Sequence, residues 1–302
     1  MSGMRLNTAL LTVVLLTATA AAAQTPSPVL GEDAVKVSDH VWAIMGYPNI
    51  GIVIGARGAL VVDTGLGPRN GATVARVVAR LAPKAKLYLT TTHFHPEHAS
   101  GEAGFPPGTT LIRNTVQQQE LEAHGEATIA AFSAKNDLQR ELLANVTLRK
   151  PDITFDNDYR LDLGGGVKLR LLWFGSAHTR GDEVVFVEPD KTLISGDVVQ
   201  NKVVPRISGE GGTAASWIAV LDKVQALGVR HVLPDHSEVG DGTLVAKERN
   251  FIVDLDTRTL DLKRQGILAD DAGERLTTEF KAKYPEWQIA SVSGFVQSIY
   301  AE

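Results

Sequence analysis

The sequence of 302 residues contains no cysteine. This absence excludes thiolate metal ligands and a cysteine nucleophile, and it leaves stability to the hydrophobic core. Long basic runs are also missing and the formal net charge is −5, which argues against nucleic acid as a partner. No repeat and no linker divides the chain, and a composition that is 44% hydrophobic and 22% charged is typical of a globular protein.

The N-terminus has the pattern of a secretory signal. The positively charged MSGMR precedes the apolar run LLTVVLL and then TATAAAAQ, whose small residues suit cleavage near Ala23. A membrane anchor is the alternative, but the run is short for a span of about 20 residues. We predict a signal peptide over residues 1–23 and a periplasmic or secreted mature protein, free of the membrane, over residues 24–302. The mature protein is expected to be one domain with a helical tail over residues 243–302.

Short strand-like runs alternate with helical patterns in the first half of the chain. HVWAIMG, IGIVIGA and GALVVDTG are rich in β-branched residues and punctuated by glycine, proline or asparagine. A helix is predicted from about Arg69 to Leu81, followed by the strand KLYLTTT. Residues 114–143 predict one or two further helices, with Asn114 as an N-cap.

The second half repeats this plan. The strand-like runs are ITFDNDYRLDL, GVKLRLLWF, EVVFVEP and KTLISGD, with a hairpin turn at Gly164 to Gly166. A helix from about Thr213 to Leu227 and the strand RHVLP follow. The two halves predict an α/β fold in which two packed β-sheets lie between outer helices, a four-layer αββα sandwich.

Side chains suited to metal binding gather in loops that follow the predicted strands. They are His93, His95, Glu97 and His98 in TTHFHPEH, His178 in GSAHTRGD, Asp197 in SGDVV and His236 in LPDHSEVG. Zinc binds imidazole nitrogens and carboxylate oxygens, and a catalytic site leaves one position open for water. In extended backbone, His93 and His95 point to the same side and can bind one ion, while the pair after Pro96 can face a second.

These segments resemble the metallo-β-lactamase-fold hydrolase superfamily. VVDTG, TTHFHPEH, GSAHTRGDEVV, SGDVV and LPDHSEVG occur in the family's order between about Val41 and His236. The resemblance implies the αββα sandwich and a hydrolase with two zinc ions. It implies that His93, His95 and His178 hold the first zinc, that Glu97, His98 and His236 hold the second, and that Asp197 bridges them. Asp63 in VVDTG would orient ligands or backbone near the site.

Glu97 departs from the family motif, which has aspartate at this position. The extra methylene moves the carboxylate by about one C–C bond, ~1.5 Å. Three outcomes are open: Glu97 ligates a shifted second metal, it holds the nucleophilic water without ligating, or the second site is weak and one zinc suffices. We expect Glu97 to remain functional because the six other positions are intact.

The resemblance implies hydrolysis of a small-molecule ester, lactone, lactam, thioester, sulfate ester or phosphoester. A water between two cations is a hydroxide near neutral pH, and Asp197 or Glu97 would orient it and pass its proton to the leaving group. Dedicated β-lactamases more often have cysteine or serine where Asp197 stands, which weakens a β-lactamase function, whereas the export signal favours it. Two alternatives remain: an iron-dependent redox member of the fold, such as a persulfide dioxygenase or a flavodiiron-type protein, and a non-catalytic binding protein.

Four further residues are candidates for substrate contacts. Tyr47 and Asn49 lie in the loop MGYPNIG, which is either a flap over the site or an ordinary hairpin turn. Lys202 and Arg206 follow Asp197 and either pair with a substrate carboxylate or form a solvated basic loop. The isolated histidines are expected to be structural or surface residues; they are His40, His124 and His231.

Overall fold

The computed structural model describes residues 27–207 and 211–302, so the predicted signal peptide lies outside the described residues. The first sheet has the strand order β1-β2-β3-β4-β5-β6-β7. Its first four strands are antiparallel, and β4 to β7 run parallel. The strands are β1 Val35–Lys36, β2 Val41–Ile44, β3 Ile50–Ile54, β4 Gly58–Val62, β5 Lys86–Thr90, β6 Thr110–Asn114 and β7 Ile153–Phe155.

The second sheet has the order β13-β12-β11-β10-β9-β8. All its neighbours are antiparallel except β11 and β12, which run parallel. Gly164, at the end of β8, pairs with Val167, so the glycines form the predicted hairpin turn. The strands are β8 Asp158–Gly164, β9 Val167–Trp173, β10 Glu183–Val187, β11 Thr192–Gly196, β12 His231–Pro234 and β13 Gly240–Asp241.

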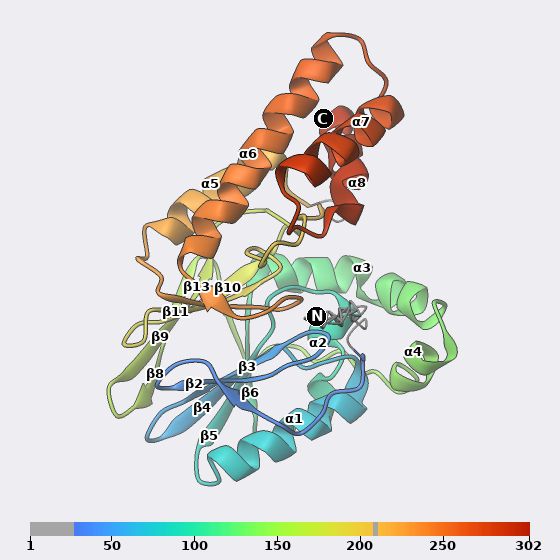
Figure 1. The fold of residues 1–302 in the computed structure, drawn as a ribbon. Helices are drawn as coiled ribbons and strands as arrows, with labels where there is room; N and C mark the ends of the chain where they lie inside the picture. Colours follow the sequence, from blue (N-terminus) through green and yellow to red (C-terminus); the bar gives the residue numbers. More distant parts are fainter. Residues whose placement is uncertain (1–26, 208–210) are drawn as a thin grey trace, which may run out of the picture.

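Helices cover the outer face of each sheet, so the predicted αββα sandwich is confirmed (Figure 1). Successive side chains of a strand point to opposite faces. Val41 and Val53 therefore pack between the sheets against Leu169 and Val185, while their neighbours Ile44 and Ile52 pack under α1. The helices are α1 Gly67–Leu81, α2 Pro96–Ala99, α3 Thr115–Ser133, α4 Asp137–Leu142, α5 Ala214–Gln225, α6 Thr243–Arg264, α7 Ala269–Lys283 and α8 Val292–Ala301, with 3-10 turns η1 Glu102–Gly104 and η2 Ile289–Ser291.

Two predicted boundaries differ from the structure. Helix α1 begins two residues earlier than expected, because Pro68 suits the first turn of a helix, where no backbone N–H is needed. The run ITFDNDYRLDL is two strands, since the chain leaves the first sheet at Phe155 and enters the second at Asp158. Asn114 caps α3 as predicted, because its side chain accepts a hydrogen bond from the Gln117 N–H.

The segment from Thr243 is helical, as expected. Figure 1 shows α6 rising from the second sheet, with α7 and α8 packed beside it. Within residues 27–207 and 211–302, no helix combines the length and the hydropathy needed to cross a lipid bilayer. The parallel pairs β4–β5 and β11–β12 belong to different sheets, and the loops that follow these four strands carry most of the candidate ligands. The packing of the two sheets therefore decides how the candidate ligands meet.

Candidate metal centre

Asp63 anchors the loop that carries the first histidines. It follows β4 and has a φ of 71°, in the left-handed region that aspartate tolerates better than most residues. Its carboxylate accepts a 2.7 Å hydrogen bond from the Thr92 N–H and a second from the Thr92 hydroxyl. The backbone before His93 is thus bound directly to the end of the neighbouring strand.

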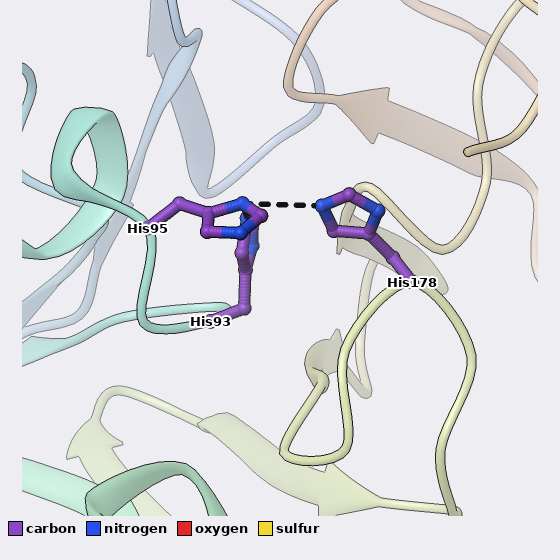
Figure 2. Close-up of side chains that lie close together, drawn as sticks. All are labelled: His93, His95 and His178. Atoms are coloured by element: carbon purple, nitrogen blue, oxygen red, sulfur yellow. Dashed lines mark hydrogen bonds between the residues drawn. The ribbon is translucent and has the colours of Figure 1, made fainter. Parts of the chain in front are cut away.

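Three histidines form the first ligand group. His93 Nε2 lies 3.0 Å from His95 Nδ1, and His178 Nε2 lies 3.2 Å from the same atom. Figure 2 shows the three rings converging from two separate loops. The carbonyl oxygen of Arg206 accepts a hydrogen bond from His178 Nδ1, which leaves Nε2 of His178 facing the group. These nitrogens lie within 4.8 Å of one another and could hold one ion.

Glu97, His98 and His236 form the second group, with ligand atoms also within 4.8 Å of one another. His98 Nε2 lies 3.3 Å from His236 Nε2. On its other side, His98 Nδ1 lies 3.1 Å from Asp63 Oδ2 and 3.2 Å from Asp235 Oδ2, so Nδ1 donates its proton there and Nε2 faces the group. Glu97 is buried, and its Oε2 has no hydrogen-bond partner in the part of the chain that the structure describes. A buried, unpaired carboxylate oxygen fits a cation.

Asp197 lies between the two groups. Its Oδ2 is 3.3 Å from His178 Nε2, and its Oδ1 is 3.3 Å from His236 Nε2. Gln200 Nε2 donates a 3.1 Å hydrogen bond to Oδ1 and so orients the carboxylate. One carboxylate therefore faces both groups, as a bridging ligand must.

The protonation states of His95, His236 and Asp197 suit metal binding. Burial lowers the pKa of His95 to about 2 and that of His236 to about 4, so both rings are neutral and offer a lone pair near pH 7. Burial would raise the pKa of Asp197, but His236 and His178 outweigh it and lower that pKa to about 2. His98 differs: burial lowers its pKa, but Asp63 and Asp235 raise it well above the usual value. A cation at Nε2 of His98 would have to displace a proton.

The donor set is chemically consistent. Neutral imidazole nitrogens and carboxylate oxygens suit zinc and other first-row divalent metals. The structure brings together all seven candidate ligands: His93, His95, Glu97, His98, His178, Asp197 and His236. The residues present therefore fit a two-metal centre.

A cavity of about 760 Å³ opens onto this centre. One wall is the face of α3 and the segment after it, where Ala131, Phe132 and Lys135 lie. Another wall is the segment 203–206, which holds two valines, a proline and Arg206. The cavity thus has apolar side chains in both walls, polar side chains as well in the α3 wall, and two cationic side chains.

Two of the four candidate substrate contacts are bonded elsewhere in the protein. Asn49 is buried, and its side-chain amide donates to the carbonyl oxygens of Pro234 and Ser237 at 2.8 and 2.9 Å, so it ties two loops together. Lys202 pairs with Glu286, with 2.7 Å between Nζ and Oε2, and is turned toward the C-terminal helices. The other two candidates, Tyr47 and Arg206, do line the cavity. The ring of Tyr47 lies 4.5 Å from that of His236, between centroids.

Several cavity residues were not predicted. His124, Ala131 and Lys135 recur at helical spacing on one side of α3 and its C-terminal extension, and that spacing is visible in the sequence. However, the face mixes alanine with polar residues, so no pattern indicated which side of α3 meets the site. His124, expected to be a structural or surface residue and not a metal ligand, lines the cavity and belongs to none of the possible ligand groups among the described residues.

The comparison with known proteins agrees with this geometry. A family model described as the metallo-β-lactamase superfamily matches residues 44–236, more than half of the chain. The chain belongs to this superfamily. The resemblance drawn from the five sequence segments is therefore confirmed, as is the histidine-rich cluster that carries it.

The similar proteins include alkylsulfatases and metallo-β-lactamases. A linear primary-alkylsulfatase from Pseudomonas sp. is 25% identical over 256 residues, which cover 73% of this chain and 48% of the relative. The chain thus spans about half the length of this curated relative.

Solved structures show the same fold at low identity. A stereoselective inverting sec-alkylsulfatase from Pseudomonas sp. matches with a TM-score of 0.70 and 15% identity, covering 88% of this chain and 49% of that one. A metallo-β-lactamase from Pontibacter korlensis matches with a TM-score of 0.58 and 21% identity, covering 74% of this chain and 99% of that one.

Proposed function

We propose that this protein is a zinc-dependent hydrolase whose substrate is an anionic ester with an apolar chain, with alkyl sulfates the first class to test. The superfamily and the ligand cluster support a metal-dependent hydrolase. One ion would be held by His93, His95 and His178, and the other by Glu97, His98 and His236, with Asp197 contacting both. A zinc pair supplies an activated water and a Lewis acid that stabilises charge developing at the scissile group.

The side chains that line the cavity support an anionic ester with an apolar chain as the substrate. Apolar surface beside the ligands comes from Phe94, Phe132 and the segment 203–205. Lys135 and Arg206 offer positive charge at the same cavity. An alkyl sulfate has both matching parts, an apolar chain and an anionic ester group, and cationic side chains recognise such oxyanions well. The curated relative is named an alkylsulfatase, and the alkylsulfatase structure matches with a higher TM-score than the metallo-β-lactamase, 0.70 against 0.58, which favours this class over lactams.

The chain's own polar groups have distinct roles in this proposal. Asp197 stays ionised, so its carboxylate would balance the positive charge of the ions and orient the water between the two ligand groups. Burial raises the pKa of Tyr47, so its hydroxyl stays protonated and can donate a hydrogen bond to a substrate oxygen. Glu97 would act as a ligand, the first of its three possible roles, because its carboxylate belongs to the second group and its Oε2 has no hydrogen-bond partner among the described residues.

The test is sulfate release from decyl sulfate by the zinc-loaded protein, with chelated protein as the control and a chromogenic cephalosporin as the competing substrate. We expect chelator-sensitive release of sulfate and slow or absent opening of the lactam ring. Fast lactam opening without sulfate release would replace the proposal with a β-lactamase function. Protein that holds zinc but hydrolyses neither substrate would contradict the alkyl sulfate proposal.

Metal analysis separates the remaining alternatives. We expect about two zinc ions per chain, as a two-metal centre requires. Iron in place of zinc, with activity restored only by iron, would favour the redox alternative. We also propose a periplasmic or secreted location, which rests on the signal-like residues 1–23.

A further inference from the structure

Part of the cavity wall comes from the C-terminal helices. Ser291, at the end of η2 and just before α8, lines the same cavity as His95 and Glu97. It lies outside residues 44–236, which the family model matches. This part of the site therefore belongs to a segment that the family assignment does not describe.

Residues 286–288 hold the loop that follows Asp197. The Gln288 N–H donates a 2.8 Å hydrogen bond to the Lys202 carbonyl oxygen, and Val203 and Gln288 form a parallel β-bridge. The Lys202–Glu286 ion pair is largely exposed, and such pairs contribute little. The backbone contacts are therefore the main attachment.

The C-terminal segment is itself fixed by the core. Trp287 is only 9% exposed and stacks on Phe251 of α6, with ring centroids 4.0 Å apart and an interplanar angle of 8°. Ile289 is buried in the same cluster. Because stacked, buried side chains hold the backbone on both sides of Gln288, the position of Ser291 is set by packing.

The loop of residues 200–206, which residues 286–288 hold, is also bonded to the candidate ligands. Near its start, Gln200 is hydrogen-bonded to Asp197, and at its end the Arg206 carbonyl oxygen is bonded to His178. The loop is thus tied to the metal centre at two points and to the C-terminal helices between them. A change at residues 286–291 should reach the substrate wall without removing a ligand.

We infer that the end of η2 forms part of the substrate-binding wall and that Ser291 there determines how large an apolar group the cavity accepts. This inference rests on the proposed function. A short side chain at position 291 leaves room in the cavity, and a bulky one would occupy space that a long alkyl chain needs.

The experiment compares the wild type with Ser291→Trp and with the matched control Ser298→Trp, which lies on α8 but does not line the cavity. Each zinc-loaded protein is tested for binding of decanesulfonate, which cannot be hydrolysed, by calorimetry, and for hydrolysis of butyl and decyl sulfate. We expect Ser291→Trp to weaken decanesulfonate binding and raise KM for decyl sulfate by at least about tenfold. The KM for butyl sulfate should rise less than the KM for decyl sulfate, the zinc content should equal that of the wild type, and Ser298→Trp should match the wild type in every measurement.

Unaltered decanesulfonate binding by Ser291→Trp would overturn this inference alone. A wild type that neither binds decanesulfonate nor hydrolyses either ester would overturn the proposed function and this inference together. Ser291→Leu provides a smaller obstruction if the indole destabilises the fold, which thermal unfolding of each variant would detect; it should weaken binding in the same direction.

Discussion

Glu97 is the residue at which this chain departs from its family, and the structure gives its side chain a defined place. Its carboxylate is buried beside His98 and His236 with one oxygen unpaired among the described residues. We expect Glu97→Ala to lower the zinc content toward one per chain and kcat/KM by at least about tenfold, a loss typical of damaged metal sites. Metal analysis and initial rates on the same preparation would measure both.

Glu97→Asp is the matched control because it restores the family pattern and keeps the charge. It should retain more zinc and more activity than Glu97→Ala. If Glu97→Ala kept full activity and full zinc content, Glu97 would be neither a ligand nor an orienting group.

Glu183 gives a pH dependence of stability that is separate from the ligands. It is fully buried at the start of β10, where the Thr90 hydroxyl donates to it at 2.6 Å, and burial raises its pKa to about 8. The unfolded chain loses this proton near pH 4.5 but the folded chain keeps it, so the free energy of unfolding should fall by a few kcal/mol between about pH 4.5 and 8.

Urea unfolding at several pH values would test this in the wild type and in Glu183→Gln, which stays neutral at every pH. The decline with pH should be shallower in the variant, and the two proteins should differ most in slope between pH 5 and 8. Parallel curves would show that Glu183 does not carry the effect.

At the scale of elements, Phe132 of α3 and Lys135 just after it shape the part of the cavity that would bind the anionic group of the substrate. The Lys135 ammonium group lies 3.3 Å from the centroid of the Phe132 ring, which holds it at the wall. We expect Lys135→Ala to raise KM for alkyl sulfates roughly three- to tenfold with kcat nearly unchanged, because it removes binding that ground and transition states share.

Steady-state kinetics at low and high salt would measure this effect, which should shrink as salt screens the charge. Lys84→Ala, an exposed lysine that does not line the cavity, is the control and should behave as the wild type. A fall in kcat without a change in KM would contradict a binding role for Lys135.

The elements also show what the sequence could predict. Strand runs and the histidine motif are local patterns, so the sandwich and the seven candidate ligands could be identified in advance. Asn49 could not, because its amide bonds to Pro234 and Ser237, which are far away in the chain. The contact between Val203 and Gln288 is equally distant in sequence, and no periodicity signals it. Contacts between residues far apart in the chain thus fixed the positions of the residues whose roles the sequence analysis did not predict.

At the scale of the whole molecule, the candidate ligands come from both sheets. His93 and His95 follow β5 of the first sheet, whereas Asp197 and His236 follow strands of the second. An ion held by both sets should stabilise the folded state, since it binds the native protein and not the unfolded chain. We expect chelation to lower the thermal unfolding midpoint by on the order of 10 °C.

Thermal unfolding of zinc-loaded and chelated protein would measure this shift. The variant Asp197→Asn, which loses the carboxylate that faces both groups, should show a smaller difference between the two states. Identical midpoints for loaded and chelated wild type would mean that the site does not couple to folding.

The shared position of Asp197 between the two groups has a consequence for how the protein assembles. Neither half of the chain can complete the site alone, because His178 and His95 meet only after the sheets have packed. Metal binding would therefore come late in folding, after the two sheets have packed correctly. The chain has no cysteine and so cannot form a disulfide bond. Metal coordination would instead cross-link residues far apart in the sequence, and this cross-link would be reversible.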